Sequence, residues 1–520
     1  MPTEKARLSP LPLLAVALFS GIVLFHLANA LTGRSFFRAS HLGAALEYAR
    51  GPINLFRPVM VGFNANGTPA ALEFPVWQAV AGLAFKAAHS TWYGWANLVS
   101  LFFFATGLWP LFQLARQYVG ARAAWWSMVF FLAQPLIIVL AGEAATDGFC
   151  LVAMLWFLFC ADQMIRTKKI SWWLPTACFA ALSAVTKLPF FMTAGLCSLF
   201  ILLGSSVRSP RAWILLGSAG GVAAIVFFAW SHYADALSAQ ALYPYQELRL
   251  SQNPSMVFWF FGDLHYRLSP AHWFKGGWRF LHATLGALPM FLLLAAALLR
   301  PGNRMPKAWL LATLPTTLIF THLVLEHWHY YLMCCPAVAM LCGATLARWE
   351  NFWTQEMPRP CLRTVLAGLI LVFSAVDGIV AMKVSLLYDP FKKNLATVIH
   401  EKTKPADKLI VFDPDDWGGE ILFRSDRNGL CIFSLENRPG VSTAKGLTEL
   451  LTNEADLSRL KALGYNKLVL LGESPVRYAV EAANPNSQKV RRHFPEMISS
   501  TVDTWPVVYR SEDMLIKDIP

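Results

Sequence analysis

Ionisable side chains interrupt long apolar stretches of this sequence at four places, and their chemistry is the first guide to a site. An ionisable residue at membrane depth is costly, so it usually marks a pathway, a binding site or an ion pair. The side chains in question are Arg34, Arg38, His41, Glu47, Arg50, Arg57, Glu73, Glu143, Asp147, Lys187, Glu326, His327 and His329.

These residue types suit one kind of reaction. Arginine and lysine side chains would hold an anionic phosphate. A carboxylate or a neutral imidazole could remove the proton from an acceptor hydroxyl. Helices lying in the membrane interface would let a lipid tail remain in the bilayer while its headgroup reacts. The set therefore fits the transfer of a group from a lipid phosphate.

Each of these residues also has a simpler explanation. The arginines could bind lipid headgroups, and Glu143 and Asp147 could cap the helix that begins at the sequence TDGF. Lys187 could be a snorkelling lysine, and HWHYY at 327–331 could belong to an aromatic belt. The two histidines of HWHYY are poor candidates for a metal pair, because residues two apart do not share a helix face. Their common side of the membrane, derived below, favours a shared site.

The composition indicates a membrane protein. Hydrophobic residues make up 56% of the chain and charged residues 15%, whereas a soluble chain carries roughly 25% charge. The 20 Trp and 37 Phe agree, because aromatic rings settle at membrane interfaces. The net charge of +12 forms no single basic patch, so no nucleic-acid partner is expected. The cysteines include no CxxC pair, which argues against a disulfide framework or a Cys-based metal site.

Apolar segments predict about eleven transmembrane helices. With a cytoplasmic N-terminus, the short loops rich in Lys and Arg all fall on the cytoplasmic side. Long loops at 32–90 and 232–280 then lie outside, together with the C-terminal part. The predicted spans are 11–31, 91–115, 121–141, 147–164, 171–187, 188–204, 211–231, 281–299, 308–325, 330–347 and 363–383.

Two further segments are expected to be helices in the outer interface. Residues 74–88 are apolar but short and contain Lys86, and residues 40–50 have a similar amphipathic pattern. If 74–88 crossed the membrane, every later basic loop would move outside. The transmembrane domain with its outer loops is therefore expected to cover residues 1–389.

The sequence changes character near residue 390. LIVF at 409–412 and KLVLLG at 467–472 are short apolar runs typical of strands. The segment 447–465 between them has helical spacing and ends at a glycine. Residues 390–520 are therefore predicted to form a soluble α/β domain on the outer side.

Four segments together carry a family resemblance. They are FRASHLGAALEYAR at 37–50, LEFPVWQAVAGLAF at 72–85, PLIIVLAGEAATDGF at 135–149 followed by AVTKLPFF at 184–191, and EHWHYYLMCCP at 326–336. In their order and spacing they resemble the GT-C membrane glycosyltransferases. The resemblance is specifically to the family 39-like group, which includes protein O-mannosyltransferases and the aminoarabinose transferases of lipid A.

The resemblance implies a polyprenyl-phosphate sugar donor and an active site in the first outer loop, with an acidic base. This chain departs from the pattern, because no Asp occurs between residues 32 and 73 and His41 stands where it is expected. His41 or Glu73 would then act as catalytic base; alternatively, transfer activity is lost or the acceptor chemistry differs. Phe74 also replaces a family lysine. The substrate-binding residues are expected to be Arg38, Asp147, Lys187, His329 and Tyr330.

The hypothesis is an inverting glycosyltransferase of a bacterial inner membrane, moving a sugar to a lipid, glycan or protein acceptor on the outer side. Membrane lipids would surround it. No cofactor is established by the sequence, but Glu73 with a histidine could hold a divalent metal ion. One alternative is a transporter or lipid flippase, for which the sequence lacks the expected inverted repeats. The other is a non-catalytic envelope-assembly or receptor protein, in which DPDDWGGE at 413–420 could bind a cation or a sugar.

Overall fold

The computed structural model describes most of the chain as two compact units. The described residues are 10–32, 39–59, 71, 73–204, 209–239, 254–286, 294–298, 302, 304–356, 368, 371–380, 390–413, 420–433, 451, 453–472 and 502–520. One unit comprises Met1–Ser35, Asn97–Ala229 and Trp259–Leu386, and the other comprises Phe36–Ala96, Trp230–Phe258 and Leu387–Pro520. The predicted division at residue 390 stays a prediction.

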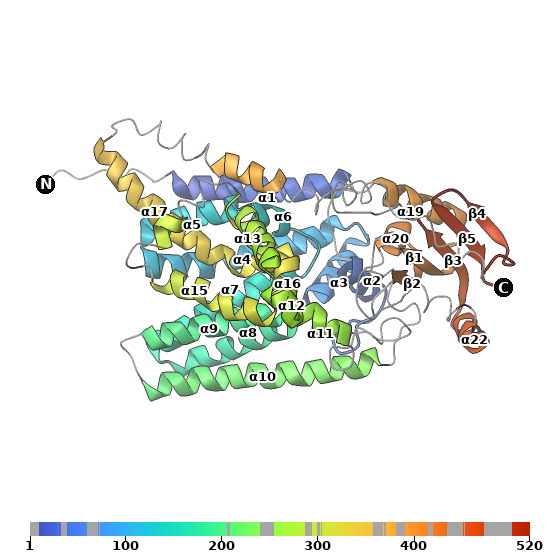
Figure 1. The fold of residues 1–520 in the computed structure, drawn as a ribbon, viewed down its shortest axis with the longest axis horizontal. Helices are drawn as coiled ribbons and strands as arrows, with labels where there is room; N and C mark the ends of the chain where they lie inside the picture. Colours follow the sequence, from blue (N-terminus) through green and yellow to red (C-terminus); the bar gives the residue numbers. More distant parts are fainter. Residues whose placement is uncertain are drawn as a thin grey trace. The chain divides into compact units, whose positions relative to one another are not determined.

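The first unit is a bundle of helices (Figure 1). Its elements up to residue 204 are α1 (Leu11–Thr32), α4 (Gly94–Val119), α5 (Ala121–Ala133), α6 (Pro135–Leu140), α7 (Asp147–Thr167), η1 (Ile170–Trp172), α8 (Trp173–Thr186) and α9 (Leu188–Gly204). Next come α10 (Pro210–Ser238), which continues into the second unit, and α11 (Pro254–Phe261), which begins in the second unit. α12 (Leu264–Leu268) and α13 (Pro270–Thr284) follow. The last are α15 (Arg304–Ile319), α16 (Thr321–Glu326), η3 (Trp328–Met333) and α17 (Cys335–Glu356).

Four of the helices in the described residues are long and apolar enough to cross a membrane. They are Leu11–Leu31, Gly94–Val119, Asp147–Thr167 and Pro210–Ser238, and each coincides with a predicted span. Shorter apolar helices, among them Ile170–Thr186 and Leu188–Gly204, cover others. The predicted spans 281–299 and 363–383 are described only in part, at 281–286 and 294–298 and at 368 and 371–380. The prediction of a polytopic helical protein is confirmed.

The predicted span 121–141 is interrupted where one continuous helix was expected. Gln134 adopts an extended conformation with φ −64° and ψ 133°, and it separates α5 from α6. The cause is local, because the ring of Pro135 disfavours helical backbone in the residue before it.

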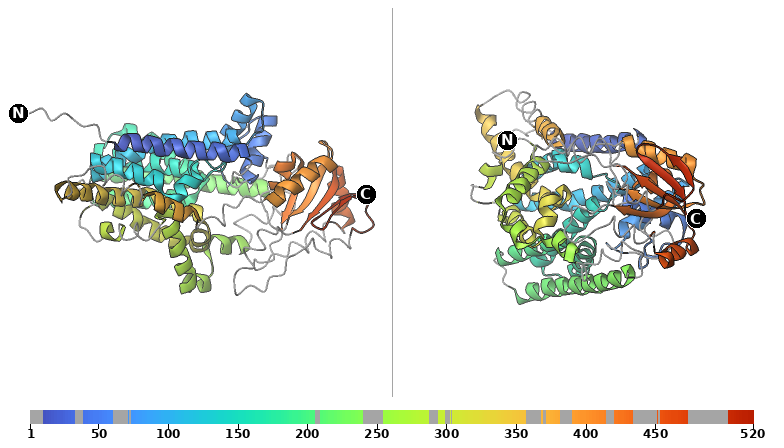
Figure 2. Two further views of the ribbon diagram at one scale, coloured as in Figure 1. Left: turned by 90° about the horizontal axis from the view of Figure 1, so that it is seen from above. Right: turned by 45° about the vertical axis from the view of Figure 1, so that its right-hand side comes forward.

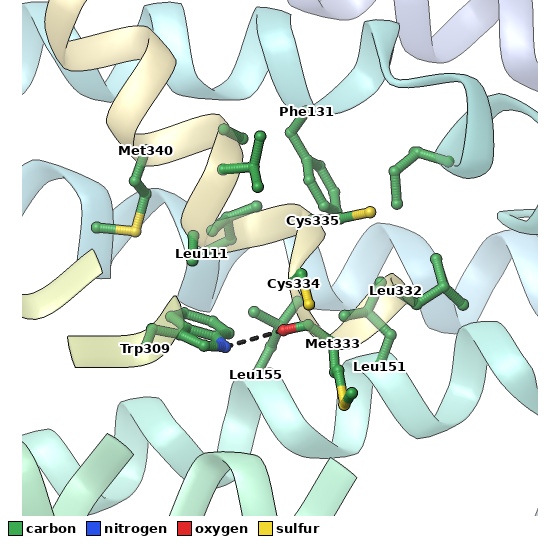
Figure 3. Close-up of a cluster of buried hydrophobic side chains, with 14 of the residues drawn as sticks. Leu111, Phe131, Leu151, Leu155, Trp309, Leu332, Met333, Cys334, Cys335 and Met340 are labelled. Atoms are coloured by element: carbon green, nitrogen blue, oxygen red, sulfur yellow. Dashed lines mark hydrogen bonds between the residues drawn. The ribbon is translucent and has the colours of Figure 1, made fainter. Parts of the chain in front are cut away.

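A continuous apolar core holds this bundle together. Trp309 is fully buried, and its indole N–H donates a hydrogen bond of 2.9 Å to the carbonyl oxygen of Met333 (Figure 3). Phe131 and Cys335 pack in the same cluster. Cys334 and Cys335 are buried, as expected of small residues inside a membrane bundle.

The predicted outer loop 232–280 contains helices that were not anticipated. α10 continues to Ser238, and α11, α12 and α13 follow. Pro270 occupies the first turn of α13, where its missing N–H costs nothing. Phe274 and Trp278 are exposed on α13. Their spacing of four residues, visible in the sequence, was the overlooked sign of an amphipathic helix.

The second unit contains the short helices α2 (Ala39–Arg50) and α3 (Val76–Ala88), together with a mixed sheet and the helices that accompany it. α3 has 13 residues, fewer than the roughly 20 needed to cross a bilayer, as expected for residues 74–88. A Cβ atom at Gly82 would lie 2.6 Å from Cβ of Tyr48, so only glycine permits the close approach of α2 and α3.

The sheet has the strand order β2-β1-β3-β5-β4, with its strands drawn in orange and red in Figure 2. β1, β2 and β3 run parallel, while β5 runs antiparallel to β3 and β4. The predicted strands 409–412 and 467–472 correspond to β1 and β3. Their apolar runs, 409–412 and 468–471, are buried, as expected of strands that are covered on both faces. The bounds are α19 (Pro390–Lys402), β1 (Lys408–Asp413), α20 (Glu420–Ser425), β2 (Asn428–Phe433), α22 (Glu454–Ala462), β3 (Tyr465–Leu471), β4 (Val507–Arg510) and β5 (Met514–Asp518).

Candidate functional site

The first unit contains a buried ion pair between two of the predicted residues. The ammonium group of Lys187 donates a hydrogen bond to Oδ1 of Asp147. Asp147 is fully buried and Lys187 is 5% exposed. A lone buried charge costs several kcal/mol, so each of these groups depends on its partner.

Helix ends position both members of this pair. Asp147 is the first residue of α7, with Thr146 as its N-cap, and no side-chain capping bond forms there. Lys187 lies in the break between α8 and α9, in extended conformation with φ −148°. Pro189 follows in the first turn of α9, a position that proline favours. The carboxylate of Asp147, in the first turn of α7, is directed to Lys187.

His329 and Tyr330 complete this cluster from η3. Nε2 of His329 lies 3.9 Å from Oδ1 of Asp147, and Nζ of Lys187 lies 5.2 Å from the centre of the Tyr330 ring. The rings of His329 and Tyr330 are 4.4 Å apart. An ammonium group over an aromatic face is stabilised by the ring quadrupole. These four residues, predicted from three segments of the chain, thus form one cluster.

Phe190 is a further neighbour that the sequence reasoning did not single out. Its ring centre lies 6.3 Å from that of Tyr330, and it is fully buried. Its position three residues after Lys187, in TKLPFF, places it on the first turn of α9. Phe190 and Tyr330 belong to the same apolar core cluster.

The second unit contains the other predicted pair. Nε2 of His41, on α2, lies 3.4 Å from Oε2 of Glu73, in the segment that leads into α3. The side chain of His41 is 9% exposed and that of Glu73 is 20% exposed. Trp77 is fully buried, and its ring meets His41 edge-on at 6.3 Å between centres. Such a carboxylate–imidazole pair can accept a proton and stabilise the resulting imidazolium.

Glu326 belongs to a separate charged cluster of the first unit. Its carboxylate accepts hydrogen bonds from Tyr266 at 2.8 Å, Arg279 at 2.8 Å and Lys275 at 3.1 Å. Burial opposes ionisation of Glu326, but the bond and charge of Arg279, with Tyr266 and Lys275, lower its pKa to about 2. A carboxylate held so firmly in its ionised form is a poor base, so Glu326 instead ties α12 and α13 to α16.

The structure provides no geometry for two of the predictions, the role of Arg38 and the divalent metal ion. Arg38 lies outside the described residues. For the metal ion, His41 and Glu73 offer one donor each, whereas a catalytic zinc takes three protein ligands. Among the residues that the structure describes, no group of three His, Cys, Asp or Glu is arranged to hold a metal. The described residues do not fit a metal site, and no step of a mechanism is derived through one.

Comparisons with known proteins find similarity in structure alone. No protein-family model matches the chain, and no curated protein matches it. The structure of ArnT from Cupriavidus metallidurans bound to undecaprenyl phosphate matches with a TM-score of 0.59 and 16% identity, covering 97% of this chain and 98% of that one. The arabinofuranosyltransferase AftD from Mycobacteria matches with a TM-score of 0.52 and 13% identity. That match covers 98% of this chain and 42% of AftD.

These likenesses extend over nearly the whole chain, including the helical bundle and the C-terminal sheet. The apolar helices independently indicate several membrane crossings. The chain is thus a multi-pass membrane protein with the fold of the GT-C glycosyltransferases.

Proposed function

We propose that this protein is a glycosyltransferase that moves a sugar from a polyprenyl phosphate to an acceptor hydroxyl on the outer side of the plasma membrane. One observation carries the proposal: the likeness over 97% of the chain to ArnT, a protein whose structure holds undecaprenyl phosphate. Such a transfer requires a cation for the phosphate and a base for the acceptor proton. Lys187 is a candidate for the cation, and the pair of His41 and Glu73 is a candidate for the base. The acceptor is a lipid, a glycan or a protein.

The reaction exchanges one bond for another at the sugar. The acceptor oxygen attacks C1 and forms a new C–O bond, while the bond from C1 to the phosphate oxygen breaks. The electron pair of that bond leaves with the polyprenyl phosphate, and the acceptor proton passes to a base on the protein. A single displacement of this kind inverts the configuration at C1.

His41 and Glu73 are proposed to provide the base. In one arrangement His41 takes the proton and the carboxylate, 3.4 Å away, stabilises the imidazolium. In the other, Glu73 takes the proton directly and His41 orients it. The variant Glu73→Gln separates them, because an amide still accepts a hydrogen bond but cannot take up the proton. Residual transfer is expected in the first arrangement and none in the second.

Lys187 is proposed to stabilise the departing phosphate. An ammonium group has three N–H donors, so one can remain on Asp147 while others reach phosphate oxygens. Charge that develops on the leaving group is then met by a donor already in place, which is electrostatic stabilisation of the transition state. His329 and Tyr330, with Arg38 assigned from the sequence alone, are proposed to bind the same substrate.

The test is transfer by single variants in membranes. We expect His41→Ala, Glu73→Gln and Lys187→Met each to lower the transfer rate by about 100-fold or more, the usual range for a lost acid–base or charge-stabilising group. Lys86→Met is the matched control, because Lys86 is an exposed lysine of α3. Rates equal to wild type in all three variants would refute the proposal.

A further inference from the structure

Helix α2, which carries His41, cannot owe its conformation to its own sequence. It has 12 residues, and isolated helices shorter than about 12–15 residues are marginal in water. Its stability must come from packing. Leu42, Ala45 and Tyr48 are nearly or fully buried, so most of its surface is covered by other parts of the second unit.

One partner of α2 is α3, and the other is the C-terminal sheet. The α3 contact is the close approach at Gly82. On the sheet side, Ala44 is 2% exposed and belongs to one apolar cluster with Ile410, Phe412 and Leu430. These three residues come from β1 and β2, more than 350 positions away along the chain. The C-terminal domain therefore contributes directly to the packing of α2.

A polar contact fixes the end of α2 to the same domain. Arg50, its last residue, donates to Oδ1 of Asp426 at 3.1 Å and to Oδ1 of Asn428 at 2.9 Å. These two acceptors lie in the turn between α20 and β2 and at the start of β2. The sequence also allowed Arg50 to bind lipid headgroups, but in the structure its guanidinium is hydrogen-bonded to protein side chains.

The turn that receives Arg50 is itself held firmly. Asp426 has φ of 52°, a left-handed conformation that Asp tolerates better than most residues. The next residue, Arg427, is 4% exposed and donates to the carbonyl oxygens of Asp426 at 3.0 Å, His400 at 2.7 Å and Thr403 at 2.7 Å. A buried guanidinium thus binds this turn to the end of α19.

We propose that the C-terminal domain positions His41 for catalysis, through Ala44 on the sheet and through the contact of Arg50 with Asp426 and Asn428. The catalytic role of His41 in this inference rests on the proposed function. The positioning is a property of α2 that can be measured without any substrate. Arg50 and Asp426 are positioning residues, since neither is assigned a role at the reacting atoms.

The experiment is hydrogen exchange of the full-length protein in detergent, read at the backbone amides of residues 41–50. Asp426→Gly removes the carboxylate at a position where glycine adopts the observed φ without strain. Arg50→Gln removes the charge, both of these bonds and the 3.5 Å ion pair of Arg50 with Glu47 inside α2. Arg50 and Asp426 are 38% and 63% exposed in their side chains, so each change should speed exchange about two- to five-fold. The double variant should exchange no faster than Arg50→Gln alone, because both remove one interaction.

Asp518→Asn is the matched control. It removes a carboxylate of the same domain, 43% exposed and paired with Lys467, and α2 should then exchange as in wild type. Unchanged exchange of α2 in Arg50→Gln and Asp426→Gly would overturn the positioning. In the transfer assay, Arg50→Gln should lower kcat with KM for the lipid donor unchanged.

The two hypotheses fail separately. Faster exchange of α2 in the Arg50 and Asp426 variants supports the positioning even if His41→Ala retains full transfer, a result that refutes only the proposed function. If His41→Ala loses transfer, the proposed function is supported. If hydrogen exchange of α2 is at the same time unchanged in the Arg50 and Asp426 variants, the positioning role of the C-terminal domain is overturned.

Discussion

The buried pair of Lys187 and Asp147 gives the sharpest prediction, because stability and activity should respond to it differently. Lys187→Met keeps the length of the apolar stem but removes the ammonium group, which leaves the carboxylate of a fully buried aspartate without its cation. Removing one partner of a buried pair costs about 3–5 kcal/mol. Asp147→Asn strands the lysine in the same way and should cost a similar amount.

The double variant Asp147→Asn with Lys187→Met should behave otherwise. It leaves no unpaired buried charge, and the replacement of a buried ion pair by neutral groups of similar volume is often close to neutral in stability. We therefore expect its free energy of unfolding to recover most of the loss. The coupling between the two residues should then be at least about 3 kcal/mol, at or above the upper end of the range seen for contacting residues. Transfer should stay low, because the cation proposed for the phosphate is absent.

The assay is unfolding of the purified protein in detergent, followed by tryptophan fluorescence, with transfer measured on the same preparations. If the two single losses in free energy of unfolding simply add in the double variant, Lys187 and Asp147 do not form a coupled buried pair. If the double variant transfers sugar at the wild-type rate, Lys187 has no role in transfer. A lysine that merely snorkels would give that second result.

Two further predictions concern the surrounding elements. Glu326→Gln should lower stability at pH 7 by about 1–2 kcal/mol, allowing for solvent screening of a partly exposed carboxylate. Because folding lowers the pKa of Glu326 from 4.5 to about 2, this stability is present above pH 4.5 and lost as pH falls toward 2. The variant and wild type should therefore converge in acid unfolding, and parallel curves would contradict the assignment. Gly82→Ala should cost about 1–3 kcal/mol through the clash with Tyr48, measured by urea unfolding. Gly217→Ala, with nothing within 4 Å of its new Cβ, should cost nothing, and equal losses in both would refute the packing argument.

Sequence patterns predicted those helices and strands whose formation is determined by a single segment of the chain. Apolar length predicted α1, α4, α7 and α10, and short apolar runs predicted β1 and β3. The interruption at Gln134 was missed, although Pro135 signals it locally. β2 was missed although its sequence, NGLCIF, contains the short apolar run LCIF, because the strand opens with the turn residues Asn428 and Gly429.

The candidate site was predictable only in part, and the reason is distance along the chain. The unfavourable burial of charge singled out Asp147, Lys187 and His329, and the structure brings these three together. No pattern relates Arg50 to Asp426, because 376 positions separate them. Contacts of that kind arise from tertiary packing, so the link between α2 and the C-terminal sheet could not be read from local sequence.

The central claim is tested most directly by a mass comparison of lipid-linked sugars and envelope glycans in cells that make the wild-type protein or the His41→Ala variant at equal levels. The account predicts that one polyprenyl-phosphate sugar accumulates in the variant and that one sugar is missing from an envelope glycan, lipid or protein. Identical lipid-linked sugars and identical glycans in the two cell types would contradict it.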